Sequence, residues 1–107
     1  MTEYIQAITT VPSKAVAESI ADCLLRERLA ACVQTIGPIE GRYWWQGKLE
    51  TAEEWQCVAK SRLSLFPRLQ EAIRRTHPYE VPEILATPLE TANADYLAWL
   101  DQQLAAE

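Results

Sequence analysis

Several residue types are scarce in this chain of 107 residues, and each scarcity argues against a class of protein. It contains three cysteines, three glycines and one histidine. An odd number of widely spaced cysteines does not support a disulfide framework and favours reduced thiols in the cytoplasm. The sequence has no Gly-rich phosphate loop and no defensible Ser–His–acid order, so we expect no enzyme.

Positive charge and long apolar runs are also missing. Ten Lys and Arg residues stand against fifteen Asp and Glu, a net charge of −5. Nucleic-acid binding relies on basic patches, so this balance argues against a nucleic-acid partner. No apolar run approaches the ~20 residues of a membrane span, and no secretory signal is visible. We expect a cytoplasmic protein with no membrane partner, folded as one domain over residues 1–107.

Hydrophobic periodicity predicts four strands and three helices. The predicted strands cover residues 3–11, 31–45 and 53–62, followed by a fourth that runs to about 87 and stops at Pro88. The predicted helices cover 14–29 after an N-cap at Ser13, 65–76 after a cap at Ser64, and a short segment after Asn93. The order β-α-β-β-α-β-α places two crossovers around a hairpin, which predicts an α+β, ferredoxin-like fold.

The predicted hairpin is too long for the body of such a domain. Its tight turn falls at Gln46-Gly47, and each arm could reach roughly 50 Å if straight, against a radius of gyration of about 13 Å. Tyr43, Trp44 and Trp45 sit near the tip, where they would form an unusually large exposed apolar patch. We expect them to pack against neighbouring subunits; the alternative is shorter arms whose tryptophans close a local core.

The stretch from His77 to Ile84 holds two prolines and most of the polar chemistry. Pro78 and Pro82 disfavour helix at the residues before them, which predicts an extended run at a sheet edge or a bulge. An exposed edge needs a cover, and here another subunit could provide it.

Five stretches together resemble the CutA family of divalent-cation tolerance proteins, in family order across nearly the whole chain. They are Arg28-Leu29-Ala30-Ala31-Cys32-Val33, Tyr43-Trp44-Trp45-Gln46-Gly47-Lys48, Lys60-Ser61-Arg62, His77-Pro78-Tyr79-Glu80-Val81-Pro82-Glu83-Ile84 and Tyr96-Leu97-Ala98-Trp99. The resemblance implies a ferredoxin-like fold and an intertwined homotrimer joined through edge strands. It also implies tolerance to copper and other divalent ions, and an architectural relation to trimeric nitrogen-signalling proteins of the PII type.

Three residues are candidate ligands for copper or another divalent metal ion. We do not expect such an ion to be obligatory. Imidazole and carboxylate suit Cu(II) and thiolate suits Cu(I). His77 is the first candidate, with Glu80 beside it if Pro78-Tyr79 forms a turn; the alternative is that His77 caps the second helix. Cys32 matches the family's cysteine, and the alternative for it is a buried inert thiol.

A second group consists of candidates for an intersubunit cleft or interface. Its members are Lys60, Arg62, Tyr79, Glu83, Tyr43 and Trp45. They could bind a small anion or metabolite, or simply form contacts between subunits. The sequence therefore supports a trimeric metal-binding protein or, alternatively, a PII-like binding or scaffold module whose small-molecule or protein partner is left open. A Cys32–Cys57 disulfide is not expected, because the turn places Cys57 opposite Ile36.

Overall fold

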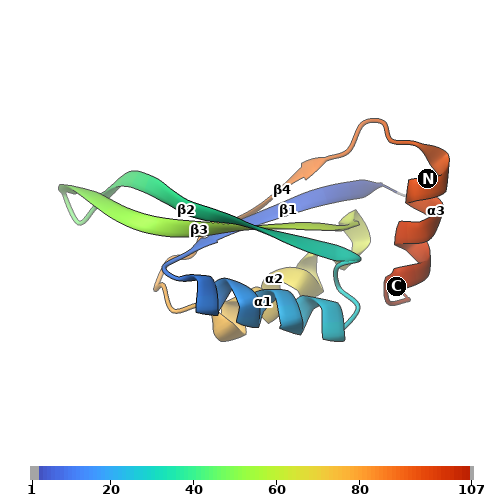
Figure 1. Ribbon diagram of the computed structural model, residues 1–107, viewed down its shortest axis with the longest axis horizontal. Helices are drawn as coiled ribbons and strands as arrows, with labels where there is room; N and C mark the ends of the chain where they lie inside the picture. Colours follow the sequence, from blue (N-terminus) through green and yellow to red (C-terminus); the bar gives the residue numbers. More distant parts are fainter. Residues whose placement is uncertain (1–2, 107) are drawn as a thin grey trace.

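The chain folds into an antiparallel sheet with two helices against one face and a third helix at its end (Figure 1). A computed structural model describes residues 3–106. The strands are β1 (Tyr4–Val11), β2 (Cys32–Trp45), β3 (Lys48–Arg62) and β4 (Ile84–Pro88). The helices are α1 (Lys14–Arg26), the short 3-10 helix η1 (Leu63–Leu65), α2 (Phe66–Thr76) and α3 (Ala94–Gln103). The strand order β2-β3-β1-β4 confirms the predicted ferredoxin-like, α+β arrangement.

The core lies between the sheet and helices α1 and α2. Alternate residues of β1 point into it, ending at the fully buried Val11. Ile20 and Leu24 of α1 meet them from one helix, and Leu69 and Ile73 of α2 from the other. These residues lie three or four apart in the sequence, and such residues share one helix face.

The helix ends differ in part from the prediction. The Ser13 hydroxyl accepts a hydrogen bond from the Val16 amide, as expected of an N-cap. However, α1 ends at Arg26, three residues early, because Arg28 takes a left-handed φ of 59°. The amides of Arg28 and Leu29 then close the helix in a Schellman pattern on the carbonyls of Leu25 and Leu24.

The cap predicted for the second helix is wrong. Ser64 lies inside η1, and Leu65 is the N-cap of α2 without a side-chain bond. Leu65 is fully buried, so packing rather than capping fixes the start of this helix. Pro67 is tolerated because it lies in the first turn, where its missing amide hydrogen would have no partner in the helix.

The hairpin of β2 and β3 extends well beyond the helices, as predicted (Figure 1). The chain measures 45 Å along its longest axis, against 26 Å and 22 Å for the other two. Gln46 and Gly47 form the turn with φ values of 50° and 80°, the left-handed region that a two-residue hairpin turn requires.

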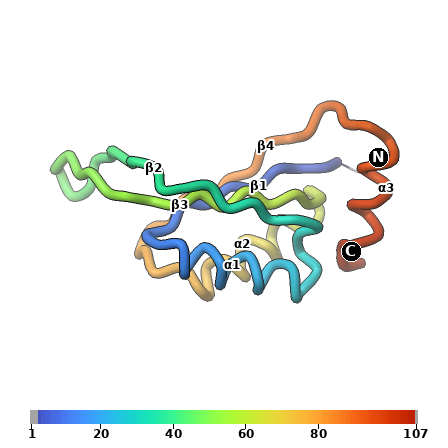
Figure 2. The backbone as a smooth tube through the Cα atoms, viewed as in Figure 1, coloured from blue at the N-terminus to red at the C-terminus, as the bar shows by residue number. Residues whose placement is uncertain are grey.

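The tube of β2 does not run straight toward the tip (Figure 2). An irregularity between Ile36 and Ile39 shifts the register within the hairpin. As a result, Cys57 faces Thr35 rather than the predicted Ile36. Cys32 faces Lys60, three residues away along β3, so the two thiols are not aligned across the ladder and remain free cysteines.

The stretch after α2 is not a continuous strand. Residues 77–83 form bends and irregular chain, and β4 begins only at Ile84 and includes Pro88. The extended run predicted from His77 is therefore wrong, because the His77 ring accepts a bond from the Tyr79 amide and turns the chain locally. The predicted edge position is correct, since β4 is the outer strand beside β1.

Candidate functional site

A carboxylate, a phenol and an imidazole meet beside the end of β1. The Tyr79 hydroxyl donates to Oε2 of Glu54 at 3.2 Å, and the Tyr79 and His77 rings lie 5.0 Å apart. His77 Nε2 lies 2.9 Å from the carbonyl oxygen of Thr10, to which it donates. Its Nδ1 accepts the Tyr79 amide at 3.1 Å. Three distant segments, β1, β3 and the chain after α2, therefore build this corner together.

The hydrogen bonds of His77 define one tautomer, because a ring nitrogen that accepts an amide hydrogen carries no proton. Burial lowers the pKa of His77, and the bond to Thr10 and the charge of Glu54 only partly oppose this. Burial, together with the charge and hydrogen bond of Glu54, raises the pKa of Tyr79 to about 12. Near neutral pH the site thus contains a neutral imidazole and a neutral phenol.

Glu54 is the acidic residue of this site, and the sequence analysis did not select it. Its side chain is 8% exposed, and its carboxylate lies against the backbone of Gly41, where a Cβ would come 2.0 Å from Oε1. Among residues 3–106 no lysine or arginine forms an ion pair with it. The sequence gives only a slight signal for Glu54, namely a glutamate on β3 close to a glycine on β2. Its contact with Tyr79 comes from a remote segment.

The Cys32 thiol belongs to a second site, at the start of β2. Its Sγ lies 3.6 Å from the Tyr96 hydroxyl on α3, and Tyr96 stacks against Trp99 at 5.6 Å. The hydrogen bond to Cys32, followed by burial, raises the pKa of Tyr96 to about 12. Cys32 is half-buried, so the alternative of a fully enclosed thiol does not describe it.

Arg62 holds α3 in place. Its guanidinium pairs with Asp101 at 3.2 Å and donates to the carbonyl of Ala105. Asp101 also accepts the Tyr4 hydroxyl at 2.5 Å. Because Arg62 is only 9% exposed and bonded within its own chain, it contributes to the fold rather than to an open cleft.

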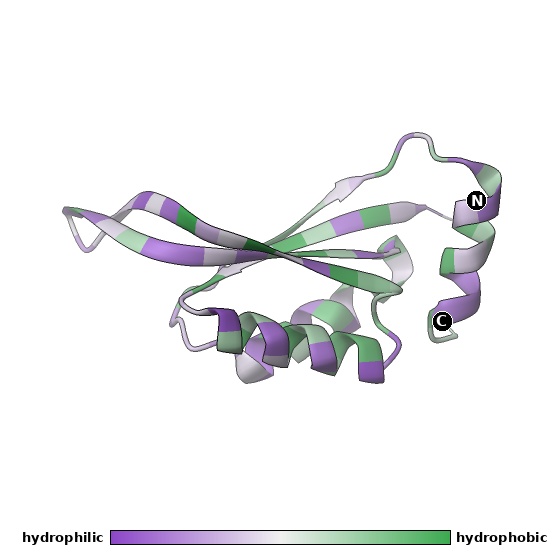
Figure 3. Cartoon of the chain, in the orientation of Figure 1, coloured by the Kyte–Doolittle hydropathy of each residue, from purple (hydrophilic) through white to green (hydrophobic). Residues whose placement is uncertain are grey.

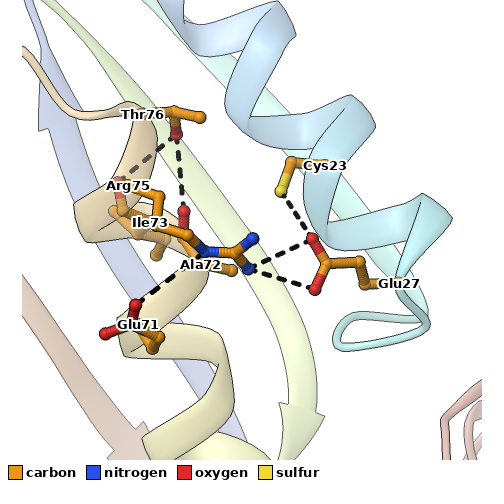
Figure 4. A network of polar contacts seen from close by, with 7 residues as sticks. All are labelled: Cys23, Glu27, Glu71, Ala72, Ile73, Arg75 and Thr76. Atoms are coloured by element: carbon orange, nitrogen blue, oxygen red, sulfur yellow. Dashed lines mark hydrogen bonds and ion pairs between the residues drawn. The ribbon is translucent and has the colours of Figure 1, made fainter.

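The other two cysteines have structural surroundings. Cys23 donates to Glu27 at 3.1 Å, and Glu27 is bound by Arg75, so the thiol joins a network that links α1 to α2 (Figure 4). Burial and then the bond to Glu27 raise the pKa of Cys23. Burial raises the pKa of Cys57 to about 11. Both residues are therefore thiols rather than thiolates near neutral pH.

The three candidate metal ligands do not meet within the chain. His77 binds Thr10, which faces Gln56, whereas Cys32 faces Lys60, four residues or ~13 Å further along β3. Glu80 is exposed in the bend after Tyr79. Residues 3–106 contain no group of three or more His, Cys, Asp or Glu side chains placed to hold a metal ion.

The remaining candidates are spread over the surface. Lys60 is half-buried, and its amine reaches Gln34 Oε1 at 3.3 Å. Glu83 is exposed next to β4. Tyr43 and Trp45 are exposed on the projecting hairpin, as the interface prediction requires. Beside them a shallow hollow of about 380 Å³ lies over the hairpin, lined by Pro38, Ile39, Glu40, Thr51, Ala52 and Glu53.

The chain is similar to a known protein family and to solved structures. The family model described as CutA1 divalent ion tolerance protein matches residues 5–103. The chain belongs to the CutA1 family. A relative described as divalent-cation tolerance protein CutA from Thermus thermophilus is 43% identical over 93 residues, covering 87% of this chain and 90% of that protein. The crystal structure of CutA1 from Oryza sativa superimposes with a TM-score of 0.95 at 37% identity, covering 98% of this chain and 96% of that one.

The CutA relatives differ from this chain in length. The chain spans 51% of the chloroplastic CutA 1 of Oryza sativa and 54% of the mouse CutA protein, about half of each. The family region is therefore shared, whereas those relatives contain further sequence.

The predicted cytoplasmic location is not upheld. A solved structure from Archaeoglobus fulgidus, 37% identical, with a TM-score of 0.89 and coverage of 96% of this chain and 98% of that one, is described as a periplasmic divalent cation tolerance protein CutA. Cysteine number and acidic charge therefore do not settle the compartment, because a relative with this fold is described as periplasmic. No helix between residues 3 and 106 has the length and hydropathy that a membrane crossing requires.

Proposed function

We propose that this chain contributes to divalent-cation tolerance by binding copper at sites shared between the subunits of a homotrimer. Each shared site combines His77 and Glu80 of one subunit, whose imidazole and carboxylate suit Cu(II), with Cys32 of another, whose thiolate suits Cu(I).

The observation that carries this proposal is the separation of the ligands. The thiol of Cys32 and the ring of His77 face positions ~13 Å apart along β3, whereas protein–metal bonds measure about 2 Å. One chain therefore cannot bring both to one ion, but a second chain beside it can. The exposed aromatic hairpin gives a reason for such an assembly, because patches of this kind usually mark interaction surfaces.

Binding at His77 has a structural cost. Both ring nitrogens are engaged, Nε2 by Thr10 and Nδ1 by the Tyr79 amide. A metal ion must replace one of these bonds, and the Nδ1 bond is the one whose loss would free the 77–79 turn. Copper binding at this residue is therefore expected to alter the mobility of Tyr79, which reports on the site without any enzymatic readout.

Copper titration of the purified assembly tests the proposal. Cu(I) is supplied under reducing conditions against a competing chelator, and Cu(II) is titrated by calorimetry. Cys32→Ser should weaken Cu(I) binding at least tenfold, and His77→Ala should weaken Cu(II) binding, with a smaller loss for Glu80→Gln. Cys23→Ser, which removes a similarly half-buried thiol away from the proposed sites, is the matched control. Equal affinities in all variants would remove the proposed sites.

A further inference from the structure

One face of β3 carries an anion and a cation that form no ion pair within residues 3–106. Positions 54 and 60 are an even number of residues apart, so Glu54 and Lys60 project from the same side of the strand. It is the side away from α1 and α2, because Cys57 and Ala59 of the alternate set pack into the helical core. The two charges are six residues, ~20 Å, apart, too far to pair within one chain.

Glu54 requires a positive partner more than an exposed glutamate does. It is buried, and within residues 3–106 its hydrogen bond comes from the neutral hydroxyl of Tyr79. A buried carboxylate without a cation is costly, and such groups are normally paired or bonded to several donors.

Lys60 is the complementary group. Its amine contacts the amide oxygen of Gln34, and within the described chain it forms no ion pair with a carboxylate. Its neighbour on the same face, Arg62, is in contrast neutralised by Asp101. Of these two basic residues on the open face of β3, Lys60 is thus the one without an acidic partner.

We propose that Glu54 of each subunit forms an ion pair with Lys60 of the next, so that the Glu54–Tyr79 site is completed only by a second copy of the chain. Opposite charges six residues apart on one strand fit a head-to-tail contact, which closes into a ring when repeated by a rotation axis. This inference rests on the homotrimer proposed above and specifies one contact within it.

The pairing has a consequence for the metal sites. Cys32 lies directly opposite Lys60 in the β2–β3 ladder, and His77 lies beside Glu54 through Tyr79. An ion pair between Glu54 and Lys60 of neighbouring subunits would therefore bring the His77 corner of one copy toward Cys32 of the other. The same contact that neutralises the buried charge would place the candidate ligands near each other.

A double-mutant cycle on trimer dissociation tests the pair. Glu54→Gln and Lys60→Met keep the side-chain sizes, and dissociation constants are measured by sedimentation over a dilution series. Each single variant should raise the dissociation constant at least tenfold. The dissociation constant of the double variant should be no higher than that of the single variant with the larger effect. Glu53→Gln is the matched control, since Glu53 is an exposed neighbour on the opposite face of β3; it should change the constant less than twofold.

The outcomes separate the two proposals. Fully additive effects of Glu54→Gln and Lys60→Met, in a wild-type chain that forms a trimer, would overturn the ion pair and leave the trimer and its copper sites standing. A single-site effect no larger than that of Glu53→Gln would overturn it as well. A wild-type chain that does not associate would contradict both the trimer and the pair.

Discussion

The two ends of the β2–β3 ladder are both paired in antiparallel fashion. The base of the ladder is buried, whereas its tip is exposed. At the base, Cys57 and Ala59 are buried under α1 and α2. Beyond the bulge at Ile36–Ile39, Trp44 is 73% exposed and Leu49 is 62% exposed, although they face each other across the ladder. Hydrophobic, intermediate and hydrophilic positions are mixed along the arm out to the tip (Figure 3). The arm thus carries large apolar side chains that no second layer within residues 3–106 covers.

The largest effect is expected at the base. Ile20→Ala removes a fully buried side chain of α1 and should lower the free energy of unfolding by about 2–5 kcal/mol through lost burial and a residual cavity. Guanidinium unfolding measures it. Leu49→Ala, the counterpart on the arm, should leave the unfolding of a separated subunit nearly unchanged; a loss as large as that of Ile20→Ala would show that the arm is already covered in one chain.

The arm should instead matter for association. Trp44→Ala removes the most exposed aromatic side chain of the hairpin, and a tryptophan at the centre of an interface typically contributes about 2 kcal/mol or more. We expect the trimer dissociation constant to rise about 30-fold, the equivalent of that energy, while far-UV circular dichroism of the chain stays the same. An unchanged dissociation constant would exclude Trp44 from the interface.

A smaller effect of opposite sign is expected inside the core. The Thr9 hydroxyl is buried without a hydrogen-bond partner in the described chain, so Thr9→Val should raise the free energy of unfolding by about 1 kcal/mol. Ser61→Ala is the contrast, because its hydroxyl donates to the Leu29 carbonyl at 2.7 Å and its loss should destabilise the protein. Thermal unfolding of the two variants should therefore move in opposite directions; destabilisation by both would indicate a partner for Thr9.

The smallest expected effect is the contribution of His77 to the pH dependence of stability. The pKa of His77 is lowered in the folded protein, chiefly by burial, so the unfolded chain binds more protons as pH falls below the ordinary histidine value of about 6.5. Stability is then fully present above that pH and is lost as pH falls toward the lower folded pKa. His77→Gln should make the stability curve flatter between pH 7 and 5. Parallel curves for wild type and variant would contradict the assignment.

Sequence reasoning succeeded where neighbours along the chain decide the structure. The Gln46-Gly47 turn followed from its need for left-handed φ, and the helices α1 and α2 followed from hydrophobic spacing. It failed where distant contacts decide. The bulge at Ile36–Ile39 moved the partner of Cys57 by one residue, and the His77 ring bent a segment that its prolines suggested was extended. Glu54 was missed because its hydrogen-bond partner Tyr79 lies 25 residues away in the chain.

The same limit applies to the metal candidates. Residue type identified His77, Cys32 and Glu80, and the resemblance supported them, but pattern alone could not show that the first two lie on separate parts of the sheet. That separation depends on the strand order β2-β3-β1-β4, which places β2 and the end of β1 on opposite sides of β3.

The central claim is that one chain cannot cover its own hairpin arm. Light scattering combined with acrylamide quenching of tryptophan fluorescence, on wild-type protein over a dilution series, tests it most directly. We predict a mass of three chains with Trp44 and Trp45 shielded, and increased quenching as dilution separates the subunits. A single chain that remains folded at all concentrations with its tryptophans equally shielded would contradict the claim.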